Sequence, residues 1–384
     1  MMMQREITPD VLRGFALLGI LIVNIQFIAL NVSEGARGQW AIGIGNSTAT
    51  FIIAAIFAGK FYLLFSFLFG YSSSYIIKDN KANRTRWIKR SLLLILIGIL
   101  HFTFLWHGDI LFVYGLFGLL LTLFFFRTDK TLKIWSRVIF SISLVLVLLV
   151  GVLVYIGERY FPEESFQSSS DSKLDQVLQN GTFLQAVPAR LELWVYGVWS
   201  GVFLQGGLAF AAFLLGVRLA RAKFLSAPFD NDQNSRLMKR ALLIGLPLQI
   251  LAAAVLVQNE SKPDPSEAIY LLSLFTGFMA APLLSIFYVA LIRKLIAQKP
   301  ASVLWMAAAG RISLTVYVMQ SVITSIIFGP WGLGLYQRLQ TWTVLLLAAG
   351  IWLMLVYLAT LWLKRFKQGP LEWLLALITK KERA

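Results

Sequence analysis

Long apolar runs alternate with short polar and basic segments along the whole chain of 384 residues. A membrane-spanning helix needs about 20 mostly apolar residues, because each residue adds about 1.5 Å across a hydrocarbon layer about 30 Å thick. Ten segments meet this requirement and are apolar around most of their circumference, which is typical of bilayer helices. They are 11–30, 51–77, 91–106, 110–126, 138–156, 193–217, 241–257, 268–292, 312–328 and 342–363. The pattern predicts an all-α, polytopic membrane bundle of about 10 transmembrane helices.

Charge alternates between the loops that join these segments. Lys and Arg gather in the loops 78–90, 127–137, 218–240 and 293–311 and in the tail from residue 364. Short loops rich in Lys and Arg stay on the cytoplasmic side of a membrane. Strict alternation over ten spans places all these segments on that side, so both termini are predicted to be cytoplasmic.

One membrane domain, residues 1–384, is expected, with two appendages. The long segment 157–192 is predicted to form an extracytoplasmic loop or cap that contains an amphipathic helix over 174–191. The segment 364–384 is predicted to form a cytoplasmic amphipathic tail that lies on anionic lipid. A short apolar stretch, 301–310, predicts a surface-lying or re-entrant helix before the ninth span. The first apolar run has full membrane length and no cleavage pattern after it, which favours a retained span over a signal peptide.

The composition limits the kinds of catalytic and metal-binding site that the chain can form. The chain is 58% hydrophobic and 14% charged, and it has no cysteine and two histidines. Disulfides, thiolate metal sites and cysteine nucleophiles are therefore excluded, and no metal site is expected. No P-loop, dinucleotide fingerprint or zinc-protease motif occurs. The net charge of +16 is explained by orientation in the bilayer, so nucleic acid is not an expected partner.

Ionisable residues inside apolar runs are the candidate catalytic residues, because burying one in hydrocarbon costs about 2.5–3.5 kcal/mol. His101 lies about 16 Å beyond Arg90 along one helix, and imidazole exchanges protons near neutral pH. It is predicted to be catalytic; the alternative is a hydrogen-bonded core residue. Asp109 either supports that chemistry or only caps the fourth span. Lys60 either snorkels to the surface or is a buried cation that faces a cavity, whereas His107 is more simply structural.

Five further polar residues are candidates for substrate binding. Asp10 and Arg13 face the same side of the first helix and are predicted to pair, which either fixes orientation or serves a headgroup or phosphate site. Asn24 lies deeper in that helix, where a hydrogen bond to another helix is the alternative. Arg311 and Gln320 belong to the ninth span, whose many hydroxyl and amide groups suit a wet cavity.

Gly197 and Gly201 form a small-xxx-small motif in the sixth span. The simplest interpretation is that they let another helix approach closely, rather than contact a ligand.

Several separated motifs, in order along the whole chain, resemble the YeiB-type bacterial inner-membrane proteins, a family known as a domain of unknown function. The motifs are Asp10-x-x-Arg13-Gly14, Gly59-Lys60-Phe61, Gly98-Ile99-Leu100-His101, Gly108-Asp109-Ile110-Leu111, Gly310-Arg311-Ile312-Ser313, Gln320-Ser321 and Gly369-Pro370-Leu371-Glu372-Trp373. Two positions depart from the family pattern, because Val316 replaces a usual Asn and Leu375 a usual Trp. The resemblance implies a multi-pass protein of the bacterial inner membrane, distantly similar to transmembrane acyltransferases.

Two functional hypotheses follow. In the first, an acyl-CoA co-substrate enters from the cytoplasm and His101 acts as general base or transient acyl carrier towards a small-molecule, glycan or lipid acceptor. The residues expected to bind the CoA phosphates are Arg84, Arg86, Lys89 and Arg90. In the alternative, the polar groups line a path for a small solute or lipid. A membrane scaffold without a defined ligand and a homo-oligomeric state also remain open.

Overall fold

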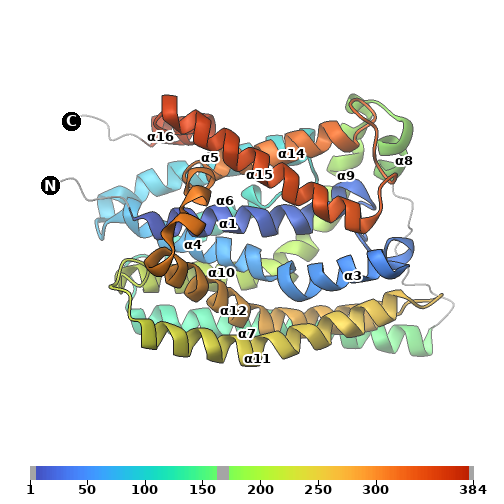
Figure 1. Ribbon diagram of the computed structural model, residues 1–384, viewed down its shortest axis with the longest axis horizontal. Helices are drawn as coiled ribbons and strands as arrows, with labels where there is room; N and C mark the ends of the chain where they lie inside the picture. The colour runs from blue at the N-terminus through green and yellow to red at the C-terminus, as the bar shows by residue number, and fades with distance from the viewer. Residues whose placement is uncertain (1–5, 162–172, 380–384) are drawn as a thin grey trace.

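The computed structural model describes residues 6–161 and 173–379, and the regular elements in these residues are helices that run along the long axis of the molecule (Figure 1). The all-α prediction is confirmed. The longer helices are α1 (Ile7–Asn24), α4 (Lys60–Ile77), α5 (Arg84–Phe104), α7 (Asp129–Tyr160), α9 (Phe183–Gly201), α10 (Gly207–Arg221), α11 (Asn231–Glu260), α12 (Glu267–Gln298), α14 (Ser313–Phe328) and α15 (Thr341–Arg365). The shorter ones are α2 (Gln26–Ala29), α3 (Ile44–Ile52), α6 (Leu111–Leu121), α8 (Lys173–Asn180), α13 (Ala307–Arg311) and α16 (Pro370–Ile378).

In the described part of the chain, seven helical stretches are long and apolar enough to cross a membrane, or eight if one bent pair counts as a span. Each predicted segment coincides with helix, but three do not reach span length as one helix. The ninth, 312–328, contains α14, which qualifies only together with the bent segment before it. The fourth, 110–126, contains only α6 and continues to Phe126 as tighter turns in which an N–H bonds the carbonyl three residues back. The sixth, 193–217, is divided between α9 and α10 by a π-helical turn, Val202–Gly206. The number of ten spans and the side of the termini stay predictions.

The helix expected before the ninth span is present. The chain from Leu304 to Arg311 forms two short helical segments that meet α14 at an angle of 84°. The break falls at Ile312, between α13 and α14. As a result α13 crosses the start of α1 instead of continuing the axis of α14.

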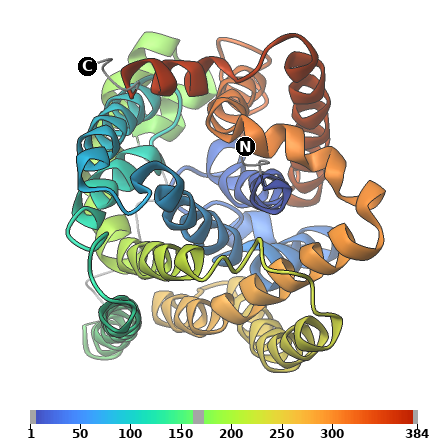
Figure 2. The same ribbon diagram turned by 90° about the vertical axis from the view of Figure 1, so that its left-hand side faces the viewer.

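Helix α1 lies in the centre of the bundle, in contact with α4, α12, α13, α14 and α15, as the end-on view shows (Figure 2). Two glycines allow the close contact with α13. A Cβ on Gly14 would lie 2.1 Å from the carbonyl oxygen of Met306, and one on Gly310 would lie 1.7 Å from that of Asp10. Because backbone atoms occupy both places, larger residues do not fit there without displacing a helix.

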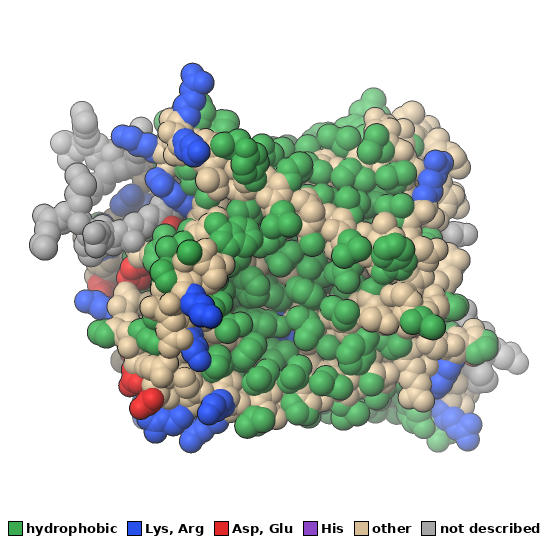
Figure 3. Space-filling view, viewed as in Figure 1, with side chains coloured by type: hydrophobic (Ala, Val, Ile, Leu, Met, Phe, Trp, Pro, Cys, Tyr) green, Lys and Arg blue, Asp and Glu red, His purple; other side chains and the backbone are tan. Residues whose placement is uncertain are grey.

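A broad apolar band crosses the middle of the face shown in Figure 3. Lys and Arg flank it, mainly at the end that carries the start of α1 and the C-terminal helix α16. On α7, large apolar side chains such as Ile142, Leu149 and Leu153 are 50–65% exposed. A band of this width with charged rims indicates a multi-pass membrane protein, because lipid replaces the aqueous solvent around such helices.

The two appendages pack against the bundle. In the segment 157–192, α8 is shorter than the predicted helix, because the chain turns at Gly181 and Thr182 before α9 starts. The carboxylate of Asp175 in α8 accepts hydrogen bonds from the Tyr336 hydroxyl and the Val32 amide. The polar run 167–172 lies outside the described residues. In α16, Glu372 accepts bonds from the first amides of α14, so the tail helix caps another helix.

Candidate functional site

A cavity of about 840 Å³ runs between α1, α4, α5, α6, α9 and α14. At one end it is lined by Arg13, Arg90 and Arg311, which belong to the first turns of α1 and α5 and to the end of α13. At the other end it is lined by Glu34 and Arg37, in the loop that follows α2. The cavity therefore connects regions close to the two ends of the bundle.

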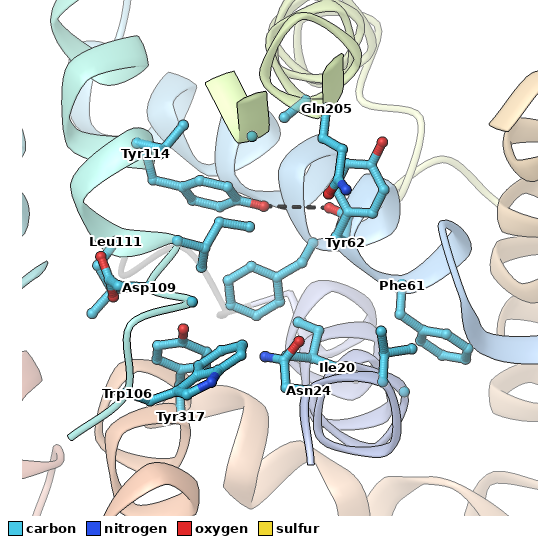
Figure 4. Close-up of a pocket in the computed structure, with 18 of the residues that line it drawn as sticks. Ile20, Asn24, Phe61, Tyr62, Trp106, Asp109, Leu111, Tyr114, Gln205 and Tyr317 are labelled. Atoms are coloured by element: carbon cyan, nitrogen blue, oxygen red, sulfur yellow. Dashed lines mark hydrogen bonds between the residues drawn. The ribbon is translucent and has the colours of Figure 1, made fainter. Parts of the chain in front are cut away.

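The middle of the cavity is lined largely by aromatic side chains and has a few polar groups (Figure 4). Asn24, Trp106 and Tyr317 approach it from one side, and Tyr62 and Gln205 from the other. The indole nitrogen of Trp106 and the hydroxyl of Tyr62 are buried, and no described residue forms a hydrogen bond with either. Buried donors without a protein acceptor are costly, which points to a polar ligand or water in this space.

Beside the cavity, His101 and Asp109, which flank one turn, form a buried polar chain with the distant Ser321. His101 Nδ1 lies 3.0 Å from Asp109 Oδ1, which is an ion-pair distance without the alignment of a hydrogen bond, and both side chains are at most 1% exposed. At the other ring nitrogen, His101 Nε2 lies 2.8 Å from the hydroxyl oxygen of Ser321. Tyr317, one turn before Ser321, stacks on the His101 ring with centroids 5.3 Å apart. Asp109 and Tyr317 line the cavity, so this chain borders it directly.

The neighbours of the ring favour one assignment of the two imidazole nitrogens. The other carboxylate oxygen of Asp109 accepts the Phe112 amide at 2.7 Å, which holds the carboxylate at the start of α6. An anionic carboxylate next to Nδ1 favours the tautomer in which Nδ1 carries the proton. Nε2 is then the acceptor for the Ser321 hydroxyl. This is the arrangement that makes a histidine a general base and a hydroxyl a nucleophile.

The basic end of the cavity contains part of the predicted binding set. Arg13 pairs with Asp10 at 2.7 Å, as predicted, and also donates to the Ser72 hydroxyl. Arg311 donates to the Lys367 carbonyl. Arg90 lines the same space. Asp10 offsets the charge of Arg13, and Glu372 also lines this end, so the three guanidinium groups leave a net basic site that suits phosphate oxygens.

Several predicted residues do not line this cavity. Lys60, predicted to face one, is buried and its Nζ donates to the Ala54 carbonyl at 2.5 Å. Gln320 donates to the Leu17 carbonyl, which is the hydrogen bond between helices expected of a packing residue. Arg84 and Arg86 bind Thr122 and the Thr379 carbonyl, and Lys89 is exposed. Of the four predicted CoA-binding residues, Arg90 alone borders the cavity.

The interpretation of Gly197 and Gly201 as helix-packing residues is wrong. No described atom lies within 4 Å of the Cβ position of either residue, and both line the cavity. Because glycine has no side chain, the cavity is wider where α9 borders it. Sequence spacing alone cannot distinguish a helix contact from an empty space, because small residues permit both.

The end of the cavity opposite the three arginines holds a buried ion cluster. Arg37 lies 2.6 Å from Glu267 and 3.3 Å from Glu260, and its guanidinium is 3.7 Å from the centre of the Tyr270 ring. Burial lowers the pKa of Arg37, but its bond to Glu267 and the neighbouring charges outweigh this, so the net pKa is raised. Burial raises the pKa of Glu34 above its ordinary value. The cluster ties the loop after α2 to the turn between α11 and α12.

These features define a class of protein: a polytopic helical bundle that holds a His–Asp pair beside an internal cavity with one strongly basic end. The family profile described as "Protein of unknown function (DUF418)" matches residues 219–381. The chain is 28% identical to the uncharacterized protein YxaH of Bacillus subtilis, over 95% of this chain and 92% of the relative. It is 27% identical to the uncharacterized protein YeiB of Escherichia coli, over 97% and 95%. The chain is thus a homologue of the YeiB-type proteins, as predicted, whereas the distant similarity to transmembrane acyltransferases stays a prediction.

Proposed function

We propose that this protein is a membrane-bound acyltransferase of the bacterial inner membrane, which moves an acyl group from cytoplasmic acyl-CoA to an acceptor that enters from the opposite side. The observation that carries the proposal is the cavity, which connects three arginines at one end with Asp109 in its wall, and Asp109 pairs with His101 directly behind that wall. A phosphate site and a general base beside one cavity suit a reaction between an anionic donor and a hydroxyl or amine.

The spacing of the two sites favours a donor with a long arm. Arg90 and His101 lie on α5, eleven residues apart, which corresponds to about 16 Å along the helix axis. An acyl-CoA carries its phosphates at one end and its thioester at the far end of an extended arm. With the phosphates at the guanidinium groups, the thioester therefore reaches the level of His101.

The lining of the cavity supports transfer over hydrolysis. Aromatic and aliphatic side chains such as Phe61, Leu111 and Trp106 surround the middle of the cavity. An apolar wall limits water around the thioester and strengthens the interaction of His101 with Asp109. The acceptor reaches the same space from the rim with Glu34 and Arg37, while α16 contacts anionic lipid at the cytoplasmic surface.

The test is acyl transfer by purified protein in liposomes with labelled acetyl-CoA and a panel of glycans, lipids and small amines. We expect acceptor-dependent release of CoA, reduced at least about 1,000-fold in His101→Ala because the general base is lost. The control is Gln249→Ala in α11, which removes an equally buried side chain bound to the Gly277 carbonyl, away from the cavity. Full activity of His101→Ala, or no CoA release with any acceptor, would contradict the proposal.

Transport is the alternative, because the same cavity extends towards both ends of the bundle. Passage of a solute requires no proton transfer at His101. Solute flux into liposomes without acyl-CoA, unchanged by His101→Ala, would favour transport and count against acyl transfer.

A further inference from the structure

Ser321 carries the polar chain one step beyond the His–Asp pair. It lies in α14, 220 positions from His101 in the sequence, and its hydroxyl oxygen is 2.8 Å from His101 Nε2. Ser321 itself is 5% exposed and Asp109 is 8% exposed. Hydroxyl, imidazole and carboxylate thus follow one another in the order that activates a serine nucleophile. Recurrence of this arrangement on unrelated folds shows that geometry, not chain order, defines it.

We propose that Ser321 is the nucleophile of the transferase and carries the acyl group as an ester between donor and acceptor. The inference rests on the proposed function and specifies its mechanism. It makes the reaction a double displacement, in which the CoA leaves before the acceptor reacts.

The proposed reaction has two steps, and each conserves atoms and protons. In the first, the Ser321 oxygen attacks the thioester carbonyl while His101 Nε2 takes the hydroxyl proton; the carbon–sulfur bond breaks, and the proton passes to the leaving thiolate. In the second, the acceptor hydroxyl or amine attacks the Ser321 ester and gives its proton to His101, which returns it to the serine oxygen. Asp109 stays anionic and stabilises the imidazolium formed in each step.

The contacts favour Ser321 over His101 as the acyl carrier. Acylation of an imidazole requires a free nitrogen that can attack, but Nδ1 faces Asp109 and Nε2 faces Ser321. The Ser321 hydroxyl, in contrast, has a base positioned to remove its proton. Asp109 and Tyr317 line the cavity and both contact His101, and His101 contacts Ser321, so Ser321 lies behind the side chains that form the cavity wall.

Helix α14 offers a matched control. Ser325 follows Ser321 by one helical turn and is 8% exposed, so it has the same residue type and a similar burial. The structure places the His101 ring against Ser321 and not against Ser325. Ser325→Ala therefore tests the loss of a buried hydroxyl from α14 without the loss of the proposed nucleophile.

The experiment incubates the purified full chain in lipid nanodiscs with acetyl-CoA alone, quenches with acid and measures the intact mass. We expect a mass increase of one acetyl group, located by fragmentation at Ser321, in the wild type and in Ser325→Ala. Ser321→Ala should show no adduct and a loss of turnover of at least about 1,000-fold. Ser321→Cys keeps a nucleophile at this position and should form a thioester adduct that hydroxylamine cleaves.

The outcomes separate this inference from the proposed function. Acceptor-dependent turnover with an adduct on His101, or with no adduct and full activity of Ser321→Ala, would overturn Ser321 as the carrier while acyl transfer itself stands. If Ser321→Ala does not fold, the Cys variant decides, because a folded Ser321→Cys that turns over without a thioester adduct contradicts the inference. No CoA release from the wild type, with or without acceptor, would overturn both.

Discussion

Helices α1 and α7 are both long and apolar, but they occupy opposite kinds of position. Helix α7 is the more hydrophobic by mean hydropathy, yet only 17% of its apolar window is buried in the bundle, compared with 61% for the stretch Ile7–Ala29 that contains α1. In a soluble protein the more hydrophobic helix would be the more buried one. Here the order is reversed, because lipid solvates apolar side chains at the rim while polar side chains find partners only inside the bundle.

The difference is also seen in the side chains. Helix α1 carries Asp10 and Arg13 as a pair and contributes Asn24 to the cavity. Helix α7 presents apolar residues such as Leu153, which is 65% exposed, to the surroundings. Changes in the centre of the bundle should therefore affect activity and folding, whereas matched changes in α7 should affect neither. The following predictions test this contrast.

The largest effect is expected at Asp109. Asp109→Asn keeps the shape and can still accept the Phe112 amide, but it presents an amide N–H to Nδ1 and so moves the ring proton to Nε2. The base is then lost, and turnover should fall about 1,000-fold. Asp129→Asn, at the start of α7, breaks an exposed pair with Arg221 and should change turnover less than about twofold. Equal losses of turnover in Asp109→Asn and Asp129→Asn would contradict a special role for Asp109.

The next effect concerns helix packing. Gly14→Ala places a methyl group 2.1 Å from the Met306 carbonyl oxygen, so α1 and α13 must separate. We expect a loss of about 1–3 kcal/mol in the free energy of unfolding, partly offset by the reduced freedom of the unfolded chain. In α7, a methyl group on Gly151 meets Leu272 at 3.4 Å, an ordinary contact, so Gly151→Ala should be neutral or stabilising by up to about 1 kcal/mol. Thermal unfolding in detergent measures both, and a destabilised Gly151→Ala would contradict the contrast.

A smaller effect is expected at Arg90. Arg90→Gln removes one guanidinium from the basic end of the cavity and should weaken CoA binding about 10-fold, because a hydrogen bond to a charged group contributes roughly 1.5–3 kcal/mol. Arg137→Gln changes an exposed arginine of α7 and should leave the affinity unaltered. Stabilisation of each variant by increasing CoA concentrations gives the two dissociation constants. The hypothesis of a phosphate site fails if the wild type shows no stabilisation by CoA.

The smallest effect concerns pH. Burial, together with the nearby Arg190, lowers the pKa of His107 to about 4, against a bond to the Val32 carbonyl that raises it. Between pH 6.5 and 4, His107 binds a proton in the unfolded chain but not in the folded chain. The free energy of unfolding therefore falls as the pH falls through this range. His107→Gln should flatten the dependence of the unfolding temperature on pH. An unchanged slope in the variant would show that His107 does not titrate in this way.

Much of the site was predictable from the sequence because it follows local rules. Asp10 and Arg13 are three residues apart on one helix, so their pairing needs no tertiary information. His101 and Asp109 flank a tight turn, which brings them together through a short loop. Aromatic residues such as Trp106 and Tyr62 gave no signal, because in an apolar run they look like ordinary lipid-facing or core side chains.

Other features depend on contacts between distant segments. Ser321 meets His101 because α14 packs beside α5, and no spacing in the chain encodes that contact. Lys60 was expected either to reach the surface or to face a cavity, but its amine donates to the Ala54 carbonyl at the break between α3 and α4. Gly197 was expected to contact a helix and instead borders open space. In each case the residue type is compatible both with a packed contact and with a cavity, and the packing of the helices determines which of the two it has.

The sequence by itself determined the class of molecule, the positions of its apolar helices and the basic segments between them, because partition into lipid depends on the hydrophobicity of each segment taken alone. The tertiary structure decided which helices lie at the centre, which arginine reaches the cavity and which hydroxyl meets the imidazole. Those choices depend on close packing between helices. Lipid solvates every apolar face about equally, so the small residues and polar pairs, and not hydrophobicity, select the neighbours.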